Sequence, residues 1–124
     1  IGPLHADQWF IDIGATPNRV PKQPSKLIKF WIPLQSHSTL SNLIVVPRSH
    51  HNIQDYKYKA VETSNGIKPV INSEVLEKDT YMINNQIGEP VIFNMSLIHG
   101  GAINLSEKCR VSLEFEFFAS NKHI

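Results

Sequence analysis

The sequence predicts an all-β domain, a sandwich or a barrel, and three observations support this fold class. Short apolar or alternating runs recur along the 124-residue chain between turn residues, which is typical of all-β folds. Eight prolines are scattered through the sequence and interrupt most windows in which an amphipathic helix would form. The length is that of one compact domain without an internal repeat, so we expect residues 1–124 to form a single domain.

The N-terminal two-thirds of the chain are expected to hold three strands and one long insertion. Apolar runs over residues 4–13, 26–34 and 42–46 are the expected strands. Residues 49–79 are polar and irregular, with one helical turn expected near residues 73–78. We interpret this stretch as a loop or lid inserted into the domain.

The C-terminal third is expected to contain four strands. A weak strand is expected at residues 80–84, and short ones at 90–94 and 96–99. The run over residues 109–118 is the clearest of all, because polar and apolar residues alternate strictly and must therefore lie on opposite faces. The apolar positions are Val111, Leu113, Phe115 and Phe117, and the polar ones are Arg110, Ser112, Glu114 and Glu116.

If the polar face of this last strand points into a barrel, its apolar face needs a cover from outside. The sequence offers no helices for that role. The chain also begins with Ile1 rather than Met, and a patterned segment follows almost at once. We therefore expect a domain truncated at its N-terminus, with an absent helical part or a second copy of the chain covering the apolar face.

Composition narrows the class of partner. A net charge of +1 with interspersed acids and bases gives no reason to expect nucleic acid or an anionic membrane as partner. No apolar run is long enough to span a bilayer, and the first residues lack the pattern of a signal peptide. The single cysteine, Cys109, excludes an internal disulfide and fits a reducing cytoplasm.

Three residues form a candidate metal site. His5 and Asp7 are spaced i and i+2, which on a strand puts both side chains on one face, roughly 7 Å apart. His99 follows an apolar run and precedes two glycines, so buried neighbours would hold its ring. Ferrous iron in oxygenases is held by two histidines and one carboxylate, with three positions left open. The remaining histidines are expected to be solvated, and they are His37, His50, His51 and His123.

Four segments, in order along the chain, resemble the phytanoyl-CoA dioxygenase family of Fe(II)- and 2-oxoglutarate-dependent oxygenases. The last segment is the most specific, because the distal histidine and an arginine fall at the separation that the family shows. The segments are LHADQWF at residues 4–10, IPL at 32–34 with SNLIVVPRSH at 41–50, GEPVIF at 88–93, and HGGAINLSEKCR at 99–110.

The resemblance implies a double-stranded β-helix, a jelly-roll or cupin-like barrel, with His5, Asp7 and His99 binding Fe(II). It further implies that Arg110 binds the far carboxylate of the cosubstrate 2-oxoglutarate. Ser112 shares the face of Arg110 on the expected strand, so we expect it to donate a second hydrogen bond. The expected reaction uses O₂ to hydroxylate a small organic substrate and releases succinate and CO₂. A carboxylate at position 7 favours hydroxylation over the halogenation that relatives with a small residue there catalyse.

Three departures from the family pattern concern the subfamily rather than the cofactor. Arg48 and Gly101 replace a usual glycine and a usual serine, and Glu89 replaces a usual aspartate. Two other function classes stay open: a cupin-like metal-binding barrel that acts as an isomerase, and a non-enzymatic binding module. The isomerase has no need of Arg110, so binding of 2-oxoglutarate discriminates it from the oxygenase. The intact ligands argue against a binding module that has lost its iron, and a metal analysis of anaerobically purified protein tests it.

Overall fold

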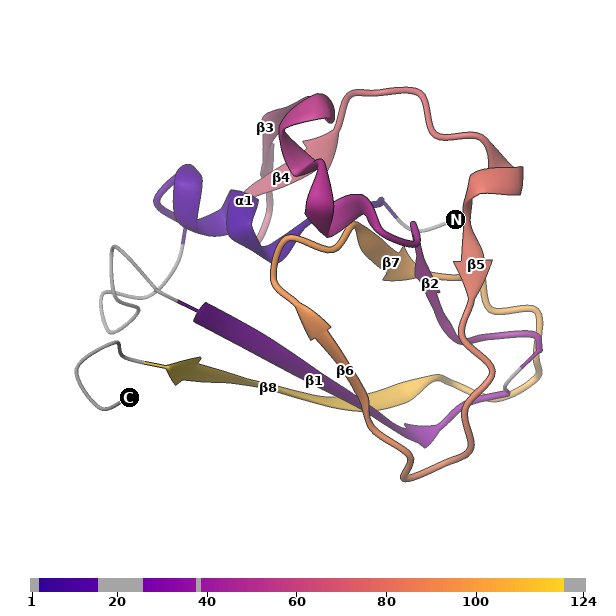
Figure 1. Ribbon diagram of the computed structural model, residues 1–124. Coiled ribbons are helices and arrows are strands. Elements are labelled where there is room, and N and C mark those ends of the chain that lie inside the picture. Colours follow the sequence, from indigo (N-terminus) through magenta and orange to yellow (C-terminus); the bar gives the residue numbers. More distant parts are fainter. Residues whose placement is uncertain (1–2, 16–25, 38, 120–124) are drawn as a thin grey trace.

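The structure is a computed structural model that describes residues 3–15, 26–37 and 39–119, and these ranges are mostly β (Figure 1). Two three-stranded antiparallel sheets have the strand orders β6-β1-β8 and β5-β2-β7, and β3 and β4 form a separate hairpin. The predicted all-β class is therefore confirmed. The elements are α1 (Asp7–Asp12), β1 (Lys26–Gln35), β2 (Leu43–Val45), η1 (Ser49–His51), η2 (Ile53–Asp55), β3 (Tyr58–Thr63), β4 (Gly66–Ile71), η3 (Glu77–Asp79), β5 (Tyr81–Met82), β6 (Val91–Asn94), β7 (His99–Gly101) and β8 (Val111–Ala119).

The long strands β1 and β8 fix which face of the first sheet points inward. Lys29 pairs with Glu116 and Trp31 pairs with Glu114, so these four side chains share one face of the sheet. Trp31 is buried, and Lys29 contacts both glutamates. The polar face of β8 thus points into the protein, as the barrel alternative from the sequence requires.

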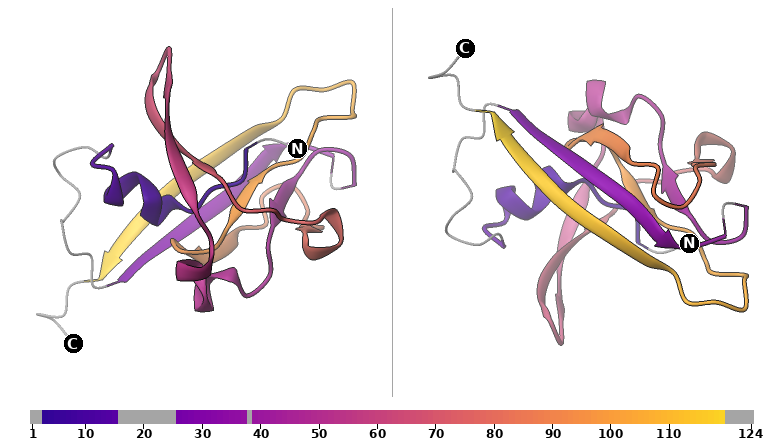
Figure 2. Two further views of the ribbon diagram at one scale, coloured as in Figure 1. Left: turned by 90° about the horizontal axis from the view of Figure 1, so that it is seen from above. Right: turned by 90° about the horizontal axis from the view of Figure 1, so that it is seen from below.

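The opposite face of the β6-β1-β8 sheet is apolar and open. Viewed from below, β8 and β1 lie in front, and no other described element covers them (Figure 2, right). The outward side chains include Phe115 and Phe117, which are 37% and 54% exposed. Such a continuous apolar surface is unusual for a free monomer. The face is formed by Ile28, Phe30, Ile32, Ile92, Val111, Leu113, Phe115 and Phe117.

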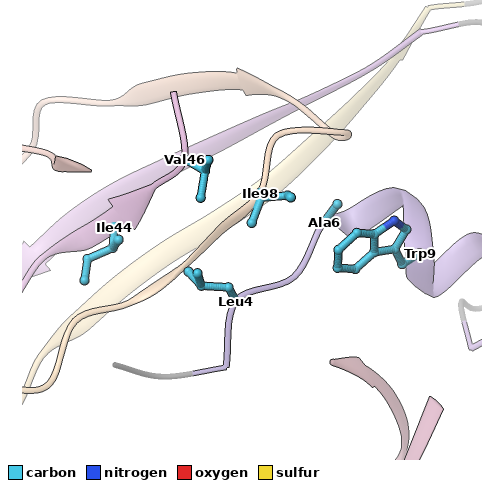
Figure 3. Close-up of a cluster of buried hydrophobic side chains, with 6 residues drawn as sticks. All are labelled: Leu4, Ala6, Trp9, Ile44, Val46 and Ile98. Atoms are coloured by element: carbon cyan, nitrogen blue, oxygen red, sulfur yellow. The ribbon is translucent and has the colours of Figure 1, made fainter. Parts of the chain in front are cut away.

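Two apolar clusters lie on the two sides of the β5-β2-β7 sheet. One fills the space between the two sheets and consists of Trp31, Leu43, Val45 and Phe93. The other joins the outer face of β2 to the N-terminal segment and α1 (Figure 3). Its buried members are Leu4, Ala6, Trp9, Ile44, Val46 and Ile98.

The expected strand over residues 4–13 is wrong beyond its first residues. His5 forms an isolated antiparallel bridge, but the chain then turns into α1. A helix suits this segment because Ala6 and Trp9, three apart, both face the core. Asp7 lies in the first turn, where the helix dipole favours an acid, and Gln8 donates a 2.8 Å hydrogen bond to Asp12 one turn on.

The expected irregular character of residues 49–79 is also wrong, because this stretch contains the β3-β4 hairpin. The turn places Gly66 at φ 104°, a conformation that glycine adopts without strain. The Asn65-Gly66 pair between two alternating runs was the available signal for a hairpin. The expected helical turn near residues 73–78 corresponds to η3, shifted toward the C-terminus. A lid role for the stretch stays a prediction.

The remaining expected strands are present with shifted bounds. Residues 80–84 contain the two-residue β5, and residues 90–94 contain β6. The expected strand at 96–99 is displaced, because a turn in which Asn94 accepts hydrogen bonds from the next residues delays β7 until His99. None of the helices in the described ranges is long and apolar enough to cross a bilayer.

Candidate metal centre

His5 and His99 lie side by side because the backbone pairs them. The amide of each donates a 2.9 Å hydrogen bond to the carbonyl of the other, so the N-terminal segment extends the β5-β2-β7 sheet beyond β7. Directly paired residues project their side chains to the same face. The two imidazole rings are accordingly 4.6 Å apart between centroids.

Asp7 reaches the same point from the first turn of α1. Its Oδ1 atom is 3.7 Å from Nε2 of His5 and 3.7 Å from Nε2 of His99. The sequence expected Asp7 on the same face as His5 from strand geometry. The structure brings the two together by a different route, because the chain leaves the bridge at His5 and begins the helix at Asp7.

The hydrogen bonds of the two rings determine which nitrogens face Asp7. Nδ1 of His99 lies 2.9 Å from the carbonyl of Leu97, and Nδ1 of His5 lies 3.2 Å from that of Pro3. A carbonyl only accepts, so each Nδ1 carries the proton and donates it. In the neutral rings both Nε2 atoms then present lone pairs toward Asp7. Histidines that bind a metal typically donate their other ring N–H to a carbonyl in this way.

Burial keeps His99 in the neutral, ligand-competent form. The residue is only 4% exposed, and Phe93 packs against its ring with centroids 4.8 Å apart. Burial lowers the pKa of His99 from its ordinary 6.5 to about 4, against the opposing attraction of Asp7. His5 is more accessible, with about a quarter of its side chain exposed, so the centre opens toward solvent on its side.

These three residues fit a divalent transition metal. Their ligand atoms all lie within 4.8 Å of one another, compared with about 3–3.5 Å for neighbouring ligands around one bound ion. Three lone-pair donors face one another at distances too long for hydrogen bonds. Two imidazoles and one carboxylate are the donor set of non-haem ferrous sites.

Arg110 lies just before β8 begins, and its guanidinium lies beside Gly101 of β7. A Cβ atom added to Gly101 would lie 2.7 Å from Nη1 and 2.9 Å from Cζ of Arg110, so the guanidinium fills the space in front of that glycine. Gly101 is two residues beyond His99 on β7 and shares its face, roughly 7 Å along the strand. Nη1 donates long hydrogen bonds of 3.4 Å to the carbonyls of Asn42 and Ala102.

The other residues considered from the sequence fall in different places. Ser112 is half-buried opposite Pro33 on the inward face of β8, and its contact with a cosubstrate stays a prediction. The remaining histidines do not join the centre within the described ranges: His37 and His51 are exposed, His50 is half-buried, and His123 lies outside those ranges.

Sequence reasoning missed Lys29, the residue that contacts Asp7 most closely. Its Nζ lies 3.0 Å from Oδ2 of Asp7 and 3.0 Å from Oε2 of Glu114. Burial disfavours the charge, yet the neighbouring carboxylates of Asp7 and Glu114 raise the pKa of Lys29 above its ordinary value. The available signal was a lysine at the inward position between Leu27 and Trp31.

No family model matches this chain, and neither the curated proteins nor the solved structures compared with it give a match.

Proposed function

We propose that this chain is the catalytic domain of an Fe(II)- and 2-oxoglutarate-dependent oxygenase that hydroxylates a small organic substrate and releases succinate and CO₂. The observation that carries the proposal is the convergence of His5, Asp7 and His99 with their lone pairs toward one point. Two facing antiparallel sheets with an inward polar strand also fit the double-stranded β-helix that we propose as the fold.

The position of Arg110 favours a dicarboxylate cosubstrate. Its guanidinium is on the same side of β7 as His99, about two residues along the strand. A short diacid whose one end chelates a metal at His99 would place its far carboxylate near this guanidinium. A planar guanidinium pairs with a carboxylate through two parallel hydrogen bonds.

The protein's own residues would have three tasks in such a reaction. His5, Asp7 and His99 would hold the ion on one side, and Arg110 would orient the cosubstrate. Phe93, packed on the ring of His99, would shield that ligand from water. The bound iron would supply redox chemistry, with open positions for cosubstrate and O₂.

The test is binding and turnover of 2-oxoglutarate by protein loaded with Fe²⁺ under anaerobic conditions. We expect the wild-type chain to bind 2-oxoglutarate only with metal, by calorimetry, and to form succinate when O₂ is admitted. Asp7→Ala should lose metal-dependent binding, because it removes one of three ligands. Arg110→Ala should keep the metal but weaken 2-oxoglutarate binding about tenfold or more, the contribution of a charge-assisted contact.

Lys68→Ala is the matched control, since it removes an exposed cation from β4 on the separate hairpin. It should leave both metal and 2-oxoglutarate binding unchanged. If wild-type protein binds the metal but neither binds nor turns over 2-oxoglutarate, the oxygenase proposal is wrong, and an isomerase or a binding module with the same ligands takes its place.

A further inference from the structure

Lys29 is a buried cation in the middle of the inward face of β1. It is 7% exposed, and its Nζ contacts three carboxylates. They are those of Asp7 (Oδ2) at 3.0 Å, Glu114 at 3.0 Å and Glu116 at 3.9 Å. Both glutamates belong to β8, whose register with β1 is fixed by the central strand pairing. The two glutamates of β8 therefore hold the ammonium in place while it contacts Asp7.

The two oxygens of Asp7 consequently have different surroundings. Oδ1 faces Nε2 of His5 and of His99 at 3.7 Å each, while Oδ2 is next to the ammonium of Lys29. A carboxylate can bind a metal through one oxygen or through both. Turning Oδ2 toward the ion would separate it from the buried ammonium of Lys29.

We propose that Lys29 is a positioning residue that restricts Asp7 to one-oxygen coordination of the metal. The proposal rests on the metal site of the proposed function. In an octahedral ion, three protein ligands leave three positions free, and a second oxygen from Asp7 would take one of them. A cosubstrate that chelates through two atoms, together with O₂, needs all three. Lys29 would thus keep the site open without contacting the ion itself.

Mn²⁺ is the probe for this proposal, because the relaxation of water protons reports how many exchangeable waters the bound ion carries. Wild-type protein should carry three waters on Mn²⁺. In Lys29→Met the freed Oδ2 should displace one water, so the inner-sphere relaxation should fall by about one third for an octahedral ion. The affinity of the Mn²⁺-loaded variant for 2-oxoglutarate should fall about tenfold or more, the size of loss usual when a group bonded to a metal ligand is removed.

Three further variants keep the test decisive. Lys29→Met leaves Asp7 and Glu114 without their cation and is the variant most at risk of unfolding. Lys29→Gln stays polar beside Glu114 but ends one atom short of the position of Nζ, so it should reproduce the loss of one water. Lys29→Arg keeps the cation and should retain three waters. The control Lys59→Met makes the same lysine-to-methionine change at an exposed position of β3, and it should carry as many waters on Mn²⁺ as wild type.

The outcomes separate this inference from the function on which it rests. If wild-type protein binds no Mn²⁺, the metal site and both proposals fail together. If wild-type and the folded Met and Gln variants carry equal numbers of waters, only the role of Lys29 is overturned. The same holds if these folded variants no longer bind Mn²⁺, since Lys29 would then be required for the site itself. If Mn²⁺ binds and the variants lose one water but wild type does not bind 2-oxoglutarate, Lys29 keeps its role and the cosubstrate is wrong.

Discussion

Lowering the pH should destabilise the metal-free protein through His99. Its pKa is 6.5 in an ordinary setting and about 4 in the folded chain, because burial disfavours the charged ring. The unfolded chain therefore takes up a proton at a pH where the folded chain does not. A group with a lowered folded pKa contributes its full stability above the unfolded value, and that contribution is lost as pH falls from 6.5 toward 4.

The size of the loss follows from the shift. Each pKa unit corresponds to 1.36 kcal/mol, so a shift from 6.5 to about 4 corresponds to about 3 kcal/mol between neutral pH and pH 4. That is a large part of the stability of a small domain. Other groups titrate over the same range, so the contribution of His99 must be isolated by comparison with a variant that lacks the titration.

The assay is urea unfolding at a series of pH values between 7.5 and 4, in the presence of a metal chelator. In His99→Leu the buried position is filled by an apolar side chain that takes up no proton. The stability difference between wild type and His99→Leu should change by about 3 kcal/mol in favour of the variant as pH falls. A difference that changes by less than about 1 kcal/mol would refute the claim that burial holds this ring neutral.

Three further predictions test the position of Arg110, a buried hydrogen bond of the core and the open face of the β6-β1-β8 sheet. Gly101→Ala should displace the guanidinium of Arg110, because the added Cβ would overlap it. By calorimetry, 2-oxoglutarate binding should weaken about tenfold while metal affinity is unchanged. Unchanged affinity for 2-oxoglutarate would contradict the proposed contact between Arg110 and the cosubstrate. Ser49→Ala should lower the free energy of unfolding by about 1–3 kcal/mol, because the buried amide of Ile98 loses its acceptor. The control Ser73→Ala removes the acceptor of the exposed amide of Lys57 and should lower it by less. Both values come from urea unfolding, and equal losses for the two variants would contradict this reasoning. Phe117→Ser should weaken self-association of the chain about tenfold, because it removes apolar surface from the open face. Sedimentation velocity measures this association. A wild-type chain that stays monomeric at high concentration would show that the open face does not self-associate.

The features predicted correctly from the sequence are those that local patterns determine. Strand β1 was predicted from an apolar run, and β8 from a period of two that also sets its polar face against its apolar face. Which face points inward was left open, because alternation is the same in a sandwich and in a barrel. The contacts of Lys29 with Glu114 and Asp7 decide it.

The features that were missed depend on contacts distant in sequence. Residues 4–13 contain an apolar run that fits a short strand or a short helix equally well, and periodicity does not separate the two at this length. Burial of Trp9 against Tyr58, with ring centroids 4.7 Å apart, favours the helix, and Tyr58 belongs to a hairpin that was itself missed. The role of Lys29 likewise appears only when β1, β8 and α1 are placed together.

The three residues singled out from the sequence nevertheless come together in the structure, although the predicted local structure of residues 4–13 was wrong. The i, i+2 argument needed only that His5 and Asp7 face the same side. The paired hydrogen bonds between His5 and His99 fix the first ring on the inward face of the sheet. Burial of Ala6 and Trp9 in the outer cluster then turns the intervening Asp7 toward the opposite, inward side. Packing of α1 thus replaces strand geometry as the cause of the convergence, so the orientation of Asp7 depends on the outer apolar cluster as well as on its spacing from His5.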